Sequence, residues 1–193
     1  MNPRIYVCTT NRGKLADFAL GLTGIPLEPM PHLSRIEPPE ENGETFEANA
    51  TAKAIYYSEH SDHPVLADDS GIIVTALDGA PGIYSARYSG EGATDASNNN
   101  LLLRNLAGHE DRSAQYVCAL AVAQRGRLLH VVEGHVDGWI VESRRGTGGF
   151  GYDPLFLYTP LNRTFAELTP EERFSVSHRG NALRKLAGIL KSR

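Results

Sequence analysis

The chain has 193 residues, of which 41% are hydrophobic and 22% are charged, and its formal net charge is -4. These proportions are ordinary for a water-soluble globular protein with one substantial core, and the charge argues against non-specific binding to a nucleic-acid backbone. Cys8 and Cys118 lie in apolar runs and form no disulfide framework or metal motif, which favours a reducing, cytoplasmic location. The first apolar stretch is too short for a signal peptide or a membrane span, so no membrane association is expected.

A strand, a helix, a loop and a second helix are predicted over the first 60 residues. RIYVCT (4–9) has the composition of a buried strand, and the apolar residues of LADFALGL (15–22) have helical spacing. The proline-rich, acidic stretch 31–44 is expected to be a loop, and TFEANATAKAIYYSEH (45–60) a helix with Thr45 as its N-cap. A strand, a short polar loop and a helix commonly hold a phosphate or a nucleotide in α/β proteins.

Two adjacent carboxylates, Asp68 and Asp69, follow the apolar residues VLA and precede IIVTAL. A turn between strands is the default interpretation of the DDSG segment on its own. If the backbone is extended instead, the two side chains point to opposite faces, and only one can face a given site. Carboxylate oxygens suit Mg²⁺, and Glu40 or Glu41 from the acidic loop could help these aspartates to bind it.

The middle of the chain predicts a helix followed by a hairpin. The helix begins at Thr94 and ends at Gly108, and the run NNN (98–100) inside it is too short to count as a low-complexity tract. AQYVCALAVAQ (114–124) and RLLHVVEGHV (127–136) are the two arms of the hairpin. Both arms are apolar at nearly every position, so we expect strands that are covered on both faces.

The last quarter of the chain begins after the glycine-rich segment GTGGFGYDP (146–154). TPEE (169–172) has the form of a capping box with Pro170 at the first helical position. The final segment (177–193) carries an amphipathic stripe of leucine and alanine. These elements together predict a mixed α/β protein in a single chain without an obvious linker.

The segment TTNRGK (9–14) is a candidate phosphate site. Arg12 and Lys14 add positive charge at a helix start, where the helix dipole disfavours cations unless an anion binds there. Gly13 would let the backbone approach a phosphate closely. The alternative is a solvated helix start capped by Asn11 or Thr10, and the Walker A spacing is absent, so both interpretations stay open.

The segment SHRG (177–180) repeats this unfavourable pattern at the start of the last helix. If Ser177 caps that helix, His178 and Arg179 lie where the dipole disfavours cations. They could donate hydrogen bonds to a carbonyl-bearing ring or to a phosphate, whereas the alternative is a solvent-exposed first turn. A solvent-exposed turn is the better account of an isolated His-Arg pair, but two helices with the same unfavourable pattern are harder to dismiss than one.

The GGFGYDP segment predicts a sharply turning loop from which Phe150 and Tyr152 project. An aromatic ring on such a loop is a natural stacking surface for a base, and Asp153 could accept hydrogen bonds from ring N–H groups. The alternative is a simple turn, because Asp-Pro is a strong turn former and Phe150 could enter the core.

Five segments resemble, in the same order, the motif set of the Ham1/inosine triphosphate pyrophosphatase family, with its bacterial branch most similar in style. They are TTNRGKLADF, GETFEANATAKA, LADDSGIIVTALDGAPGIYSARYSG, GTGGFGYDPLF and SHRGNAL, so the resemblance spans nearly the whole chain from about Arg4. It implies one domain over residues 1–193, with a mixed elongated α/β sheet, flanking helices and two lobes around a central nucleotide-binding cleft. It also implies a homodimer that needs Mg²⁺ and converts ITP, dITP and XTP to monophosphate and pyrophosphate, which removes deaminated purines from the nucleotide pool.

The resemblance also implies roles for single residues. Asp69 would be the catalytic base and a metal ligand, Glu40 a further Mg²⁺ ligand, and Ser70 a substrate contact. The other implied substrate contacts are Thr9, Thr10, Asn11, Arg12, Gly13 and Lys14 at the triphosphate, and Phe150, Gly151, Tyr152, Asp153, Arg173, His178 and Arg179 at the base. Of these, His178 and Arg179 would contact the 6-oxo edge.

Three positions depart from the family pattern. Arg173 stands where the family usually has lysine, Ala48 replaces an acid in the helix motif, and Asp17 is a shorter version of a glutamate. Arginine keeps the charge but changes the geometry of any contact with the base. Two other functions remain compatible with the chain: a Maf-like pyrophosphatase for modified pyrimidine nucleotides, and a nucleotide-binding module without turnover.

Overall fold

The computed structural model describes residues 4–21 and 26–191. Its strands are β1 (Ile5–Val7), β2 (Leu27–Pro29), β3 (Val65–Val74), β4 (Ser113–Gln124), β5 (Arg127–Ile140), β6 (Phe156–Tyr158) and β7 (Arg163–Thr164). Its α-helices are α1 (Arg12–Ala19), α2 (Phe46–Ser58), α3 (Asp95–Asn105), α4 (Pro170–Val176) and α5 (His178–Lys191). Within the described ranges, no helix has the length and apolar character that crossing a membrane requires.

One seven-stranded sheet has the order β2-β1-β3-β4-β5-β6-β7. The β1 strand pairs in parallel with β2 and β3, whereas β6 pairs antiparallel with β5 and β7. The predicted mixed α/β class with flanking helices is therefore confirmed. The chain forms two compact units, and β3, β4 and β5 each contribute residues to both of them.

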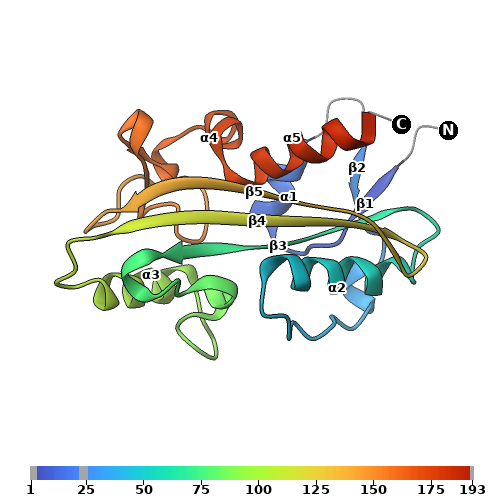
Figure 1. Ribbon diagram of the computed structural model, residues 1–193, viewed down its shortest axis with the longest axis horizontal. Helices are drawn as coiled ribbons and strands as arrows, with labels where there is room; N and C mark the ends of the chain where they lie inside the picture. The colour runs from blue at the N-terminus through green and yellow to red at the C-terminus, as the bar shows by residue number, and fades with distance from the viewer. Residues whose placement is uncertain (1–3, 22–25, 192–193) are drawn as a thin grey trace. The chain divides into compact units, whose positions relative to one another are not determined.

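Unit 1 comprises Met1–Asp69, Cys118–Gly134 and His178–Arg193. In this unit α1 and α5 lie on one face of the strands, and α2 lies on the other face (Figure 1). The α5 helix packs tightly on β5 at Gly134, where an added Cβ would overlap the backbone atoms His178 O and Ala182 N. Only glycine allows this close approach, which places the start of α5 against the sheet.

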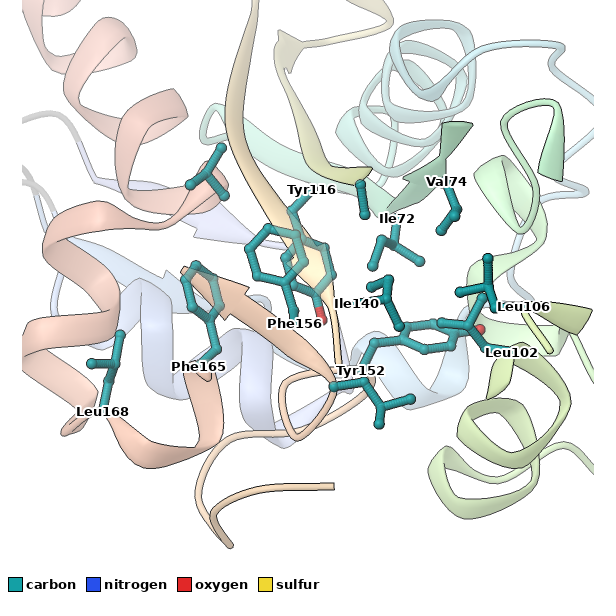
Figure 2. Packing of buried hydrophobic residues seen from close by; sticks show 13 residues of the cluster. Ile72, Val74, Leu102, Leu106, Tyr116, Ile140, Tyr152, Phe156, Phe165 and Leu168 are labelled. Atoms are coloured by element: carbon teal, nitrogen blue, oxygen red, sulfur yellow. The ribbon is translucent and has the colours of Figure 1, made fainter. Parts of the chain in front are cut away.

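Unit 2 comprises Ser70–Val117 and His135–Ser177 and has its own hydrophobic core. The rings of Tyr116 and Phe156 lie 4.4 Å apart between centroids, and those of Phe156 and Phe165 lie 4.9 Å apart. Figure 2 shows Tyr152 beside Ile140 in the same cluster. Because Tyr152 belongs to the glycine-rich segment, this core anchors that segment directly.

The predicted helix starts are confirmed at Thr45 and Thr169, whose side chains accept hydrogen bonds from the N–H groups of Ala48 and Glu172. The α1 helix begins three residues earlier than LADFALGL suggested, because Asn11 caps it by accepting from Lys14 N. The expected end of that helix at position 22 lies outside the described residues.

The hairpin forms as predicted, but its two arms differ in burial. The β4 strand is buried along nearly its whole length. The expectation that β5 is covered on both faces is wrong for its first half, where Leu128 and Leu129 are each 41% exposed. The β6 strand pairs with β5 at Trp139 and Ile140, at the far end of β5, so it does not extend along this first half.

Candidate active site

Asp68 and Asp69 lie inside β3, which runs from Val65 to Val74 without interruption. The turn interpretation of DDSG is therefore wrong, and the extended alternative holds, with the two side chains on opposite faces. The two residues are only 4% and 7% exposed. A buried carboxylate requires compensating partners, and the partners of these two are different.

Asp68 faces the cations of α1 and α5. Lys14 Nζ lies 2.9 Å from Asp68 Oδ2, and Arg179 Nη2 lies 3.5 Å from the same oxygen. Arg179 Nη1 also donates to Asp17 Oδ2 at 2.7 Å. Burial opposes the ionisation of Asp68, but Lys14, Arg179 and Lys53 outweigh it and hold the pKa of Asp68 below its usual range. The anion that both helix starts require is thus present in the protein itself.

Asp69 faces α2 instead. Asn49 Nδ2 donates to Asp69 Oδ2 at 3.0 Å, and Lys53 Nζ lies 3.5 Å from Asp69 Oδ1. The same ammonium group contacts Glu41 Oε1 at 2.7 Å. Burial raises the pKa of Asp69, and the charge of Glu41 adds to this, while Lys53 and Asn49 act in the opposite direction; the net shift is upward. A raised pKa makes this carboxylate a better proton acceptor at neutral pH than an ordinary aspartate.

Asn49 and Lys53 were missed by the sequence reasoning. They lie four residues apart in ANATAK, on one face of α2, and this spacing is the signal that could have identified them. Asn49 Oδ1 also accepts from Gly43 N at 2.8 Å, which ties the acidic loop to the same helix. One helix therefore positions both Asp69 and the loop that carries Glu41.

Of the two candidate glutamates, Glu41 is the one that shares a partner with Asp69, because Lys53 contacts both carboxylates. Glu40 is exposed, and its Oε2 accepts from Asn42 Nδ2 at 2.7 Å. The role of Glu40 as a metal ligand therefore stays a prediction. The neighbouring Glu41 enters the site geometry through Lys53, with which it forms an ion pair.

The donor set around Asp69 fits Mg²⁺ bound together with a phosphate ligand. Within the described residues, no group of three or more His, Cys, Asp or Glu side chains could hold a metal by itself. Mg²⁺ commonly takes one or two carboxylates from the protein and completes its coordination with water and substrate phosphates. Asp69 and Glu41 both contact Lys53 Nζ, so the oxygens that would serve Mg²⁺ already stabilise a positive charge.

The segment TTNRGK forms the start of α1. Asn11 caps the helix through its side chain, and Thr9 Oγ1 accepts from Asn11 N at 3.2 Å. Thr10 and Arg12 are exposed, and Gly13 is half-buried. The capping alternative is therefore realised by Asn11, and phosphate binding by these residues stays a prediction. At the other helix start, His178 is the first residue of α5 and is 7% exposed.

The glycine-rich loop of unit 2 is a tight turn around Phe150. Phe150 N donates to Asp153 Oδ2 at 3.0 Å, and Asp153 N donates to Phe150 O at 3.2 Å. Gly149 has a φ of +72°, and a Cβ there would overlap the Asp153 carboxylate. The loop therefore requires glycine at this position and leaves Phe150 half-buried at its tip.

Tyr152 and Asp153 point inward from this loop. Tyr152 is 4% exposed and its hydroxyl donates to Ser85 O at 2.8 Å, so the expectation that its ring projects from the loop is wrong. The core accommodates this ring because the hydroxyl finds a backbone acceptor. Asp153 accepts from Tyr116 Oη at 3.2 Å and lies 3.8 Å from Arg173 Nη1. In this conformation the Asp153 carboxylate holds the loop, and its contact with a base stays a prediction.

Ser70 follows Asp69 directly in β3 and is half-buried, in unit 2. Arg173 is 7% exposed in α4, where its ion pair with Asp153 links that helix to the glycine-rich loop. Within unit 1, the structure brings together Lys14, Asp68 and Arg179 in one cluster. Within unit 2, it brings together Phe150, Asp153 and Arg173.

Residues 5–189 match the model of the Ham1 family. A "dITP/XTP pyrophosphatase" from Desulfotalea psychrophila is 49% identical over 189 residues, which cover 96% of this chain and 84% of that protein. A protein of the same name from Exiguobacterium sibiricum is 47% identical over 191 residues, covering 97% and 96% of the two chains.

Solved structures agree with the sequence comparisons. A HAM1 protein from Coxiella burnetii has a TM-score of 0.88 and 37% identity, covering 98% of this chain and 99% of the other. The Ham1 protein of Staphylococcus aureus has the same TM-score with 38% identity, covering 98% of both chains.

Proposed function

Because the chain belongs to the Ham1 family, we propose that it is a Mg²⁺-dependent pyrophosphohydrolase that converts ITP, dITP and XTP to monophosphate and pyrophosphate. The observation that carries the proposal is Asp69, a buried carboxylate with a raised pKa, held by Asn49 and Lys53 beside Glu41. The names of the relatives, dITP/XTP pyrophosphatase, support the same substrate class. Removal of deaminated purine nucleotides from the pool is the corresponding cellular role.

We assign the triphosphate end of the nucleotide to unit 1. Lys14 is the foremost candidate, with Asn11 and the rest of the segment TTNRGK at the start of α1. Lys14 now neutralises Asp68, and phosphate oxygens would share its ammonium group. When bound, Mg²⁺ would offset phosphate charge, with Asp69 and a glutamate, Glu40 or Glu41, as its ligands from the protein.

In the reaction, Asp69 accepts a proton from the attacking water. Asn49 Nδ2 holds this carboxylate in place by donating to its Oδ2. The new bond forms between the water oxygen and phosphorus at the α–β linkage, and the anhydride bond breaks to release pyrophosphate. Lys53, 3.5 Å from Oδ1, keeps the carboxylate oriented before the transfer. Positioning and electrostatics supply most of the acceleration, since even a perturbed aspartate is a modest base.

We assign the purine end to Phe150, as the stacking ring, with Ser70, Gly151, Tyr152, Asp153, Arg173, His178 and Arg179 as further contacts. Donors at O6 and an acceptor at N1–H favour hypoxanthine and xanthine, because adenine reverses this pattern. Arg179 pairs with Asp17 and Asp68 in the described conformation, so His178 is our first candidate for the 6-oxo edge.

We further propose a cytoplasmic homodimer that acts on free nucleotides rather than on nucleic acid. The net charge of -4 and the two free, buried cysteines support this setting. These features agree with a small-molecule substrate and a reducing compartment.

Release of pyrophosphate from ITP, dITP, XTP, GTP, dUTP and dTTP tests the proposal, in Mg²⁺ and again in excess EDTA. We expect release from the first three nucleotides at least about tenfold above the others, and none in EDTA. A preference for dUTP or dTTP would instead support a Maf-like pyrimidine enzyme. Nucleotide binding without any release would support a non-catalytic module.

A further inference from the structure

The asparagine run Asn98–Asn100 on α3 holds three separate segments of unit 2. Asn98 Oδ1 accepts from Ser89 N at 2.8 Å, and Asn100 Oδ1 accepts from Arg144 Nη2 at 2.8 Å. Asn99 Nδ2 donates to Gly151 O at 2.8 Å. Asn98 and Asn99 are 3% and 2% exposed. Asparagine is a poor residue for a buried helix position unless its hydrogen bonds are used, so the run serves tertiary contacts.

Gly151 is held at both of its backbone polar atoms. Asp95 Oδ2 accepts from Gly151 N at 2.7 Å, while Asn99 Nδ2 donates to Gly151 O. Asp95 and Asn99 lie four residues apart and therefore on one face of α3. Gly151 has a φ of +60°, in the left-handed region that favours glycine. These two hydrogen bonds fix the orientation of the peptide groups on both sides of Gly151.

This clamp decides where the tip of the loop points. Gly151 separates the half-buried Phe150 from Tyr152, whose hydroxyl is anchored on Ser85 O. Asn98 Nδ2 donates to Ser85 O as well, at 3.3 Å, so α3 also supports the anchor of Tyr152. With Tyr152 fixed in the core, the backbone of Gly151 sets the direction of the Phe150 ring.

We propose that Asp95 and Asn99 are positioning residues for purine binding, which hold Gly151 so that Phe150 is presented to the base. This inference rests on the proposed function, in which Phe150 stacks on the purine. Both side chains contact the loop at Gly151, so their effect on the base runs through Phe150. They set the affinity for the base while leaving the triphosphate contacts unchanged.

The test compares Asn99→Ala and Asp95→Ala with wild type in steady-state hydrolysis of ITP. It also measures inhibition by inorganic tripolyphosphate, which has no base. We expect KM for ITP to rise about tenfold through the lost hydrogen bonds, with kcat and the Ki of tripolyphosphate changed by less than about threefold. Asp95→Asn should restore KM to within about threefold of wild type, because its amide oxygen can still accept from Gly151 N.

Asn105→Ala is the matched control, since Asn105 lies on the same helix but donates to Tyr88 Oη and not to the loop. It should leave KM unchanged. Asp95 is exposed, so Asp95→Ala decides the question even if Asn99→Ala fails to fold. An unchanged KM in Asp95→Ala, or an equal loss of tripolyphosphate binding, overturns the inference while the proposed function stands. A wild-type protein that does not hydrolyse ITP overturns the proposed function, and the inference with it.

Discussion

Lys14 and Asp68 form a buried ion pair, with Nζ 2.9 Å from Oδ2 and side chains that are 18% and 1% exposed. Arg179 shares the same carboxylate from α5. Cations at the start of a helix are unfavourable unless a negative charge lies nearby. Asp68 supplies this charge to both helices, and it does so from the residue next to the proposed catalytic base.

Asp68→Asn should destabilise the protein by about 3–5 kcal/mol, because it leaves Lys14 and Arg179 beside a neutral amide in a buried cluster. Urea denaturation of the variant and of wild type measures the difference. Glu28→Gln is the matched control, since its pair with Arg4 has side chains that are 43% and 48% exposed. That control should change the stability by less than about 1 kcal/mol. Similar losses in the two variants would contradict the role of Asp68.

The stability of wild type should also fall in acid through Asp68. Its pKa is lower in the folded state than in the unfolded chain, where an aspartate titrates at about 3.9. The stabilisation is therefore fully present above this value and is lost as the pH falls through the lower, folded pKa. Denaturation at pH 5 and at pH 3 should show a smaller drop for Asp68→Asn than for wild type. Equal drops would mean that other carboxylates cause the acid sensitivity.

Asp69→Asn should abolish turnover but keep most of the nucleotide affinity. The amide preserves the shape of the side chain but cannot accept the proton from water. Pyrophosphate release gives kcat, and calorimetry with ITP gives Kd. Asp62→Asn is the control, because the side chain of Asp62 is 96% exposed. A fall in kcat of less than roughly tenfold would show that Asp69 is not the base.

The thiols of Cys8 and Cys118 should be unreactive in the folded protein. Burial raises the pKa of each thiol to about 12, so both stay protonated as the pH rises through 8. The thiolate is the reactive form. A chromogenic disulfide reagent at pH 8 should therefore label two thiols per chain in urea and none under native conditions within the same time. Rapid native labelling would contradict this burial.

Gly134→Ala should destabilise the protein by about 1–3 kcal/mol or more, because its Cβ would overlap the backbone of α5 at His178 and Ala182. In Gly188→Ala, on α5, the added Cβ would meet no atom within 4 Å apart from those of its own turn of helix. This second variant should stabilise the protein by about 0.5–1 kcal/mol through helix propensity. Thermal denaturation of both variants measures the two stability changes, which should have opposite signs. Shifts of the same sign would contradict the close packing of α5 on β5.

Local features of this protein were predictable from the sequence, and long-range ones were not. Thr45 and Thr169 cap helices through atoms three residues away, so a short window contains the whole interaction. Asp68 could not be distinguished from Asp69 in this way, since its partner Arg179 lies 111 residues further along the chain. The family resemblance separates the two aspartates by assigning the base to Asp69, but the partners of Asp68 emerge only when α1 and α5 are placed on its face of the sheet.

Exposure was the second feature that a single sequence could not provide. Leu128 and Leu129 belong to an apolar run that is typical of a covered strand, but both are exposed. They lie in the half of β5 that does not pair with β6. Tyr152 lies in a glycine-rich segment typical of an exposed loop tip, but its hydroxyl donates to Ser85 O and its ring is buried in the core. In both cases a neighbour remote in sequence decided the outcome.

Unit 1 is assembled from three stretches of chain, and this limits how the protein can be dissected. A fragment that stops after Asp69 would contain both aspartates and Lys14, but it would lack Arg179 and the β4 residues from Cys118 onward. Asp17 would then lack the guanidinium that it binds. Unit 1 is therefore not a transferable module. A chimaera that replaces unit 1 would have to exchange all three stretches together.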